Sequence, residues 1–234
     1  MSGSNAPLSE DADDQAPRVP VDTTKASIAR VYDAALGGKD NYEVDREVVR
    51  RLGQVAPEIG QVTQDHRAFL IRATRFLAKE ANITQFLDCG SGLPTVENTH
   101  QVAQRIQPDA RVIYVDNDPI VLAHGRALLE ENDRTHFSAA DIFEPRQVLG
   151  DEAVHKYLDF SQPIALFQLG TLHHYNGQRP PQDIMAEYIE GMLPGLELVE
   201  PGLARCADWW PDGPQLTPLA PAQHCIVGAV GRKP

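Results

Sequence analysis

Four apolar segments separated by helical patterns constrain the fold of this chain most strongly. They read ITQFLDC (residues 83–89), ARVIYVD (110–116), THFSAAD (135–141) and PIALFQL (163–169). Helical periodicity fills the intervals, over residues 95–106, 119–131 and 146–158. Because strands that alternate with helices of this length form βαβ units, the pattern predicts an α/β fold with a mostly parallel, doubly wound sheet. The nearly continuous apolar strands indicate that helices cover both faces.

The sequence before the first strand divides into two parts. Residues 1–24 are rich in Ser, Asp, Pro and Ala and lack large apolar side chains, which predicts a disordered acidic tail. Residues 25–82 show helical spacing near 28–35, 43–52 and 62–79, which predicts an N-terminal helical cap or lid. Residues 83–234 then form the Rossmann-like domain.

Charge and cysteine content exclude several classes of protein. The 234 residues include 33 acids and 21 bases, a formal net charge of −12, so we expect no nucleic-acid partner. The three cysteines are far apart, and no spacing typical of a metal site is present. The sequence shows no secretory signal and no stretch long enough to span a membrane, so we expect a cytoplasmic protein without a membrane partner.

The loop after the first strand is the strongest candidate for a ligand site. Asp88 ends the strand, and Gly90 and Gly92 follow, with one residue between them. In an open parallel sheet, ligands bind beyond the carboxyl ends of the strands, where glycines let a ligand pack on the backbone. This short glycine pattern alone also fits an ordinary tight turn.

Two further acids follow the next two strands. Asp116 ends VIYVD, where a carboxylate can accept hydrogen bonds from both ribose hydroxyls, and Asp141 is placed to receive an adenine amino group. Either acid taken singly also fits a loop residue or a helix N-cap. Together with Asp88 they outline an adenosine site.

The residues after the glycines indicate which adenosine cofactor this is. A dinucleotide loop commonly has a third glycine and places a pyrophosphate at the helix N-terminus, whereas this chain has Pro94 and Thr95. Asp88 suits a ligand with an ammonium group. These features favour S-adenosylmethionine over NAD, and an NAD-dependent oxidoreductase is the competing interpretation.

Four motifs resemble a known family. FLDCGSGLPT (86–95), VIYVDNDPIVLAHGRALL (112–129), AADIFEP (139–145) and VYDAALGGKDNYEVDRE (31–47) are similar to the actinobacterial S-adenosyl methyltransferase family, formerly a domain of unknown function. The resemblance implies a Rossmann-like class I methyltransferase fold with an antiparallel C-terminal hairpin. It also implies S-adenosylmethionine as cofactor and methyl transfer to a small-molecule substrate, without identifying that substrate.

The resemblance assigns roles to individual residues. Asp88 matches the acid near the methionyl ammonium, Gly90 and Gly92 the glycines along the methionine and ribose, and Asp116 the ribose acid. Asn117, Asp141 and Ile142 match positions around the adenine. Asp118, by contrast, is expected to cap the helix that begins at Pro119.

The segment LGGKDN (36–41) has two interpretations. It is either a helix C-cap followed by a turn, or a lid over the cofactor in which Tyr32, Gly38 and Lys39 contribute and Tyr32 or Lys39 reaches the methionyl carboxylate. Arg67, on the following helix, is either a further carboxylate partner or a surface residue.

His173 is the candidate catalytic residue. It lies at the end of the fourth strand, in FQLGTLHHY, where the family has Leu-His. A histidine there can act as a general base or simply shape the pocket. Methyl transfer needs alignment of the reacting atoms more than it needs a base.

The chain departs from the family near residues 193–197, where two Pro-Gly-flanked pieces are joined directly and a central strand is expected to be missing. LELVE and HCIVGAVG (224–231) are expected to form the terminal antiparallel hairpin. Either HCIVGAVG moves in beside the fourth strand, or another subunit of a homo-oligomer supplies a strand. If the substrate pocket is lost with the missing part, the alternative function is a non-catalytic SAM-binding or regulatory protein.

Overall fold

The computed structural model describes residues 21–95, 97–128, 132–192, 197–202, 204–215, 218–225, 227–228 and 230–232. Most of the predicted acidic tail therefore lies outside the described residues. The centre is a four-stranded parallel sheet in the order β3-β2-β1-β4. Its strands are β1 (Gln85–Cys89), β2 (Arg111–Val115), β3 (Thr135–Ser138) and β4 (Ala165–Gln168). The predicted parallel α/β fold is confirmed.

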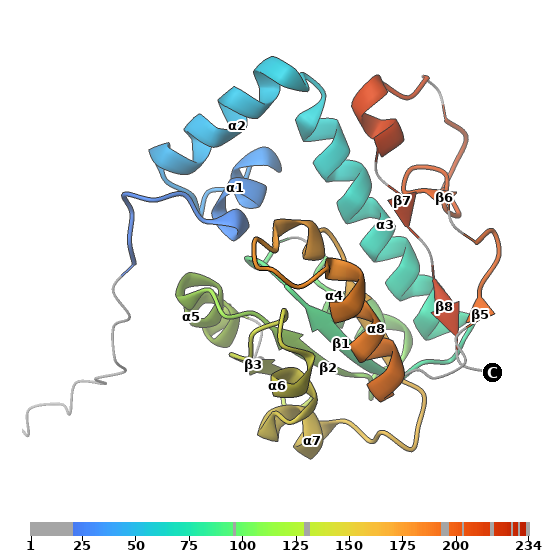
Figure 1. Cartoon of the computed structure of the whole chain (residues 1–234). Helices are drawn as coiled ribbons and strands as arrows, with labels where there is room; N and C mark the ends of the chain where they lie inside the picture. Colours follow the sequence, from blue (N-terminus) through green and yellow to red (C-terminus); the bar gives the residue numbers. More distant parts are fainter. Residues whose placement is uncertain are drawn as a thin grey trace, which may run out of the picture.

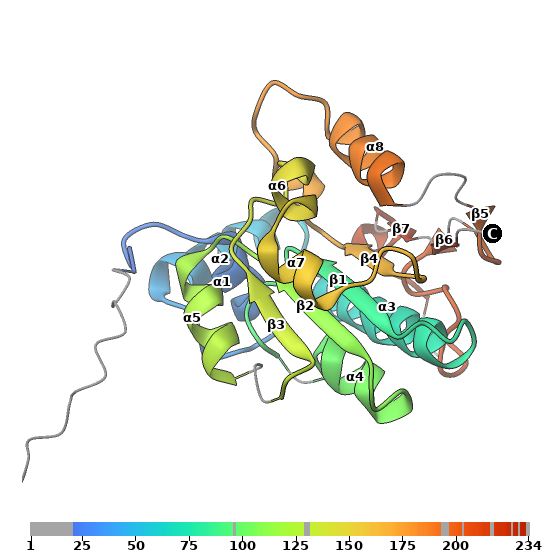
Figure 2. The same cartoon turned by 90° about the horizontal axis from the view of Figure 1, so that it is seen from below.

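Alternating side chains of the strands bury two separate apolar clusters, one on each face of the sheet. Phe86, Val112 and Tyr114 pack on one side, and Leu87 and Ile113 pack on the other. The first face is covered by α3 (Ile59–Lys79), α4 (Thr99–Ile106) and α5 (Pro119–Leu128). The second is covered by α6 (Pro145–Leu149), α7 (Glu152–Tyr157) and α8 (Pro181–Met192), as Figure 2 shows. The sheet is thus buried on both sides, as its apolar strands predict.

Two predicted helices differ from those observed. The helix expected over 95–106 begins only at Thr99, because the Asn98 side chain accepts from Thr95 N (2.9 Å) and its backbone donates to Gln101 (2.9 Å). The helix expected over 146–158 is two helices. Asp151 caps the second by accepting from the backbone N–H groups of Ala153 and Val154. Local side-chain capping thus determined these boundaries.

The predicted N-terminal cap consists of α1 (Ile28–Ala35) and α2 (Glu43–Val55), followed by α3. A buried ion pair joins the first two helices, with 2.8 Å between Arg30 Nε and Asp45 Oδ2. Ser27, at the N-cap of α1, donates from Oγ to Asp118 Oδ2 at 2.7 Å, which attaches the cap to the start of α5. Figure 1 shows α1 and α2 beside each other at the same end of the molecule as the start of α3.

The C-terminal segment packs along α3 (Figure 1). It contains two short antiparallel pairs, β5 (Glu197–Leu198) with β8 (Gly231–Arg232) and β6 (Ala204–Arg205) with β7 (Val227–Gly228). Two 3-10 helices complete the described elements, η1 (Leu172–His174) and η2 (Pro221–Cys225). Trp209 is fully buried, with its ring edge-on to that of Phe69 at 5.3 Å.

The predicted C-terminal hairpin is only partly correct. LELVE does pair with the end of HCIVGAVG, but the earlier part of that segment pairs with residues 204–205 instead. The cause is a turn at Val199, Pro201 and Gly202: Gly202 has φ of +78° and its N–H donates to Val199 O at 2.8 Å. Among the described residues, β7 and β8 do not pair with β4, and β4 has no strand on its outer side. No helix within the described ranges is long and apolar enough to cross a membrane.

Candidate cofactor-binding site

Three loops meet where β1, β2 and β4 end. Cys89 is level with Val115 on one side and with Gln168 on the other, so the loops that begin at Gly90, Asp116 and Leu169 start at neighbouring points. β1 is also the strand at which the order reverses, since the chain passes from β3 on one side to β4 on the other. This is the position at which open parallel sheets bind ligands.

The two glycines of the first loop serve different purposes. Both have positive φ, +74° at Gly90 and +66° at Gly92. A Cβ on Gly90 would lie 2.2 Å from Thr171 Cγ2 and 3.1 Å from Ile142 Cδ1, so Gly90 is required for packing. A Cβ on Gly92 would have nothing within 4 Å. Gly92 therefore leaves bare backbone beside open space, which suits close approach of a ligand.

Asp88 is a buried carboxylate at the end of β1. Thr99 Oγ1 donates to its Oδ2 at 2.6 Å. Burial raises the pKa of Asp88 to about 6, although the Thr99 hydrogen bond and the positive charge of Arg67 oppose the increase. Arg67 is held at this position by donating from Nη2 to Glu97 O at 2.9 Å, so it lies beside the site.

Asp116 lies at the start of the second loop. Its Oδ2 accepts from Gly92 N and its Oδ1 from Asp118 N, each at 3.0 Å. Burial also raises the pKa of Asp116, and the charge of Asp116 in turn raises that of Asp88. Neither carboxylate forms an ion pair with any residue that the structure describes. Two neighbouring, desolvated carboxylates favour a ligand that brings positive charge and hydroxyl donors.

The remaining acids of the motif have local roles. Asp118 accepts from Ile120 N at 2.9 Å, which confirms the predicted cap of the helix that begins at Pro119. Asp141 accepts from Phe143 N at 2.9 Å and so forms the turn after β3, while Ile142 points at Gly90. Asn117 is exposed. The adenine contacts expected of Asp141 and Asn117 stay predictions.

The LGGKDN segment is folded around Asp33. The Asp33 Oδ2 atom accepts from Asp40 N (3.0 Å) and Asn41 Nδ2 (2.8 Å), and a Cβ on Gly38 would lie 2.0 Å from Asp33 Oδ1. Gly38 is thus required by this turn. Lys39 is exposed and forms no ion pair with the described residues. These contacts favour the C-cap and turn interpretation for Gly38 and Lys39.

Tyr32 contacts a histidine that no motif indicated, and its predicted contact with the methionyl carboxylate stays a prediction. Its hydroxyl is 2.9 Å from His66 Nδ1, and the His66 ring packs on Gly170, just after β4. His173 is exposed on η1, and its charge lowers the pKa of His66. Sequence reasoning missed His66 because a single histidine in an amphipathic helix carries no pattern. Thr171 was also missed, although its place three residues after the end of β4 could have indicated it.

Two buried hydroxyl groups in the first loop have no hydrogen-bond partner in the described part of the chain. They are Ser91 Oγ and Thr95 Oγ1. Such atoms are rare in folded proteins and mark places where a ligand or water completes the structure. The two carboxylates and the unpartnered hydroxyls fit S-adenosylmethionine, and the loop lacks the third glycine that is typical of dinucleotide-binding loops.

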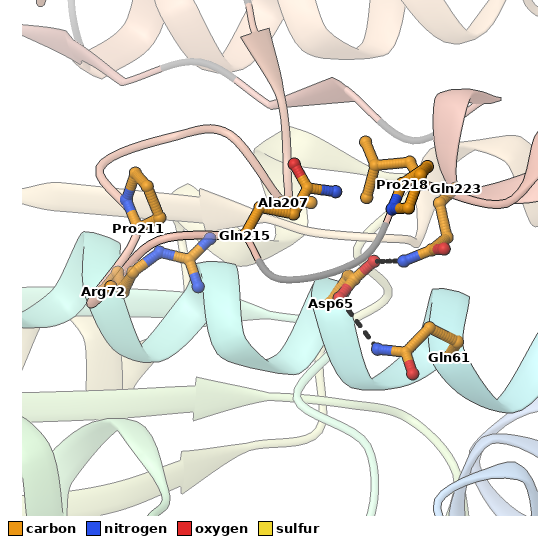
Figure 3. A pocket seen from close by; sticks show the side chains of 10 residues that line it. Gln61, Asp65, Arg72, Ala207, Pro211, Gln215, Pro218 and Gln223 are labelled. Atoms are coloured by element: carbon orange, nitrogen blue, oxygen red, sulfur yellow. Dashed lines mark hydrogen bonds between the residues drawn. The ribbon is translucent and has the colours of Figure 1, made fainter.

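A separate cavity of about 260 Å³ lies between α3 and the C-terminal segment (Figure 3). Asp65 lines it and accepts from Gln61 Nε2 at 3.2 Å, and Arg72 lines it about two turns further along α3. None of the predicted cofactor residues contributes to this cavity. Asp65 and His66 are adjacent on α3, but Asp65 lines this cavity whereas His66 packs against Gly170.

Comparison with known proteins agrees with this geometry. The family model described as S-adenosyl methyltransferase matches residues 14–195. The chain belongs to the S-adenosyl methyltransferase family. A candidate methyltransferase from Thermobifida fusca is 38% identical, with a TM-score of 0.79 over 90% of this chain and 96% of that chain. A DUF574 family protein from Streptomyces avermitilis is 31% identical, with a TM-score of 0.83 over 91% and 99% of the two chains.

No curated protein matches the chain. Membership of the S-adenosyl methyltransferase family confirms the predicted resemblance and the enzyme class. It also implies use of S-adenosylmethionine.

Proposed function

We propose that this member of the S-adenosyl methyltransferase family transfers the methyl group of S-adenosylmethionine to a small-molecule acceptor. The observation that carries the proposal is a pair of carboxylates, buried Asp88 and partly buried Asp116, that form no ion pair among the described residues and lie beside the bare backbone of Gly92. S-adenosylmethionine supplies the ammonium, sulfonium and ribose hydroxyls that such a pair favours.

In this proposal each residue has a defined task. Asp88 pairs with the methionyl ammonium, and Asp116 accepts hydrogen bonds from the ribose hydroxyls. Gly92 gives the ligand access to the backbone, and Asp141 with Ile142 lies toward the adenine. Bound S-adenosylmethionine supplies an electrophilic methyl group on a positively charged sulfur. The protein then needs to align the acceptor with that methyl group and exclude water.

The same observation argues against NAD. A pyrophosphate placed next to two carboxylates would meet like charge, and the helix after the loop begins only at Thr99. We therefore expect S-adenosylmethionine and S-adenosylhomocysteine to bind with micromolar affinity, and NAD to bind far more weakly. Isothermal titration with the three ligands tests this expectation. Comparable binding of NAD would overturn the proposal.

A non-catalytic SAM-binding or regulatory protein is the second candidate. The observation that favours it is the outer edge of β4, where no further strand pairs among the described residues. A strand there would form one side of the substrate pocket. Turnover with tritiated methyl donor and a panel of phenols, alcohols and amines separates the two. Tight binding of S-adenosylmethionine without transfer to any acceptor would favour the second candidate.

A further inference from the structure

His66 lies between the N-terminal cap and the end of β4. Its Nδ1 is 2.9 Å from the hydroxyl of Tyr32, which comes from α1. On the other side, a Cβ on Gly170 would lie 3.0 Å from His66 Cε1 and 3.1 Å from Nε2, so the glycine gives the imidazole its space. Gly170 also has φ of +66°. The ring is therefore oriented from both sides.

The other ring nitrogen of His66 has no hydrogen-bond partner within the described ranges. Nε2 is buried, and it forms no hydrogen bond with any described residue. A buried polar atom without a partner destabilises a folded protein, and a ligand or a water molecule can supply the missing bond. The partner of Nε2 is thus expected to be a bound molecule.

The position of this nitrogen indicates which molecule. Gly170 is followed by Thr171, whose methyl group packs over Gly90 in the cofactor loop. The next residue on α3, Arg67, acts electrostatically on Asp88. His66 therefore borders the cofactor site on the β4 side, away from the β2 and β3 loops that hold the predicted ribose and adenine contacts.

Resting on the proposed function, we infer that His66 Nε2 accepts the hydrogen bond, and then the proton, of a hydroxyl or amino group on the methyl acceptor, with Tyr32 as its positioning residue. For a hydroxyl acceptor, a C–O bond forms as the bond between the methyl carbon and the sulfonium sulfur breaks. The sulfur leaves as a neutral thioether, and the O–H proton moves to Nε2 and later to solvent. Atoms and charge balance without another reactant.

The contacts of Tyr32 are compatible with the tautomer of His66 that the proposal requires. Nε2 can accept only when Nδ1 carries the ring proton and donates to the Tyr32 oxygen. The Tyr32 hydroxyl can then donate to Thr63 O, which lies 3.5 Å away. An imidazole oriented through one nitrogen by a fixed partner, and open to the acceptor at the other, is the arrangement of general-base sites.

The surroundings keep His66 neutral. Burial, with the charges of Arg67 and His173, lowers the pKa of His66 to about 4, and burial raises the pKa of Tyr32 to about 12. The titratable and charged groups that act on the ring are Tyr32 from α1, Arg67 from α3 and His173 from η1. A neutral imidazole of low basicity is sufficient, because the O–H becomes strongly acidic as the new C–O bond forms.

The test compares His66→Ala, Tyr32→Phe and the control His155→Asn, an exposed histidine on α7. We expect His66→Ala to lower kcat for phenols, alcohols or amines by 10²–10⁴-fold while the Kd for S-adenosylmethionine changes less than threefold. Added imidazole should restore part of the kcat. Tyr32→Phe should lower kcat about tenfold, and the control should match the unaltered chain.

Several results would overturn the inference. Unchanged kcat in His66→Ala would exclude the role of His66. An equal loss of S-adenosylmethionine affinity would place Nε2 on the cofactor instead. Should His66→Ala fail to fold, unchanged kcat in Tyr32→Phe would count against the proposal. If the unaltered chain binds S-adenosylmethionine but methylates no acceptor, the proposed function fails first, and this inference fails with it.

Discussion

The backbone N–H of Gly92 donates to Asp116 Oδ2 across 3.0 Å, which joins the loop after β1 directly to the end of β2. The carboxylate that is expected to hold a ribose thus also fixes the loop that is expected to hold the methionine. Loss of this carboxylate would affect both halves of the ligand.

Alanine at Gly90 should mainly lower stability, whereas alanine at Gly92 should mainly lower cofactor affinity. Gly90→Ala places Cβ 2.2 Å from Thr171, in addition to a positive φ, so we expect about 2–4 kcal/mol of destabilisation and a clearly lower Tm. Gly92→Ala meets no atom within 4 Å and should cost only about 1–2 kcal/mol from its φ. Its Cβ enters the space meant for the ligand, so S-adenosylmethionine affinity should fall at least tenfold.

Gly53→Ala is the matched control for these glycine variants. Gly53 lies within α2, has no positive φ, and a Cβ there meets nothing within 4 Å. Alanine should therefore raise stability by about 0.5–1 kcal/mol without affecting the ligand. Thermal denaturation and titration calorimetry on the three variants check these outcomes. A Gly90→Ala chain as stable as the unaltered one would contradict the packing described at Thr171.

Cofactor affinity should depend on pH through Asp88. The pKa of Asp88 is raised to about 6 in the ligand-free chain, and the ammonium group requires the ionised carboxylate. Affinity should therefore be constant above pH 6 and fall up to tenfold per pH unit below it. Titration calorimetry between pH 5 and 8 measures this, and Asp88→Asn should bind weakly with a flat profile. An Asp88→Asn profile that still falls below pH 6 would assign the effect to another group.

The same shift gives a stability prediction of opposite sense. Since the folded pKa of Asp88 lies above its ordinary value of 3.8, the folded chain binds the proton more tightly than the unfolded chain. The contribution is fully present below pH 3.8 and is lost as the pH rises through about 6, a difference of roughly 3 kcal/mol. Asp88→Asn should thus be more stable than the unaltered, ligand-free chain at pH 7. Chemical denaturation of both chains at pH 7 measures this difference. Equal or lower stability of Asp88→Asn would contradict the prediction.

The buried pair of Arg30 and Asp45 should hold the N-terminal cap together. Arg30→Ala leaves Asp45 buried without its cation, which typically costs 3–5 kcal/mol. Because this cost is local, amide exchange should accelerate over residues 28–55 and remain slow in β1 and β2. Arg50→Ala is the control, since its ion pairs with Glu43 and Glu47 are exposed and should contribute less than about 1 kcal/mol. Uniform exchange throughout Arg30→Ala would show that the cap and the sheet unfold together.

The order of elements and the placement of the acids could be predicted from the sequence. The apolar runs that end in Asp88 and Asp116 lie on neighbouring parallel strands, so the pattern alone brings the two carboxylates together. The C-terminal pairing could not be predicted in full, because the turn at Gly202 redirects a chain whose apolar pattern continues. The role of Gly38 depends on Asp33, five residues earlier, in a contact that exists only once the turn has formed.

His66 shows the remaining limit of sequence reasoning. Its partners come from α1 and from the loop after β4, more than thirty and more than one hundred residues away along the chain. No local spacing predicts such a contact. His173, which position at a strand end did indicate, lies exposed close by, and its role in catalysis stays a prediction.

The most direct measurement is the affinity of S-adenosylmethionine for the unaltered chain and for Asp116→Asn, determined by titration calorimetry at pH 7.5. Charge-assisted hydrogen bonds contribute about 1.5–3 kcal/mol each, so the substitution should weaken binding by at least 10-fold and up to several hundredfold. Asp133→Asn, an exposed acid away from the site, should bind like the unaltered chain. Equal affinity in Asp116→Asn and the unaltered chain would contradict the account of this site.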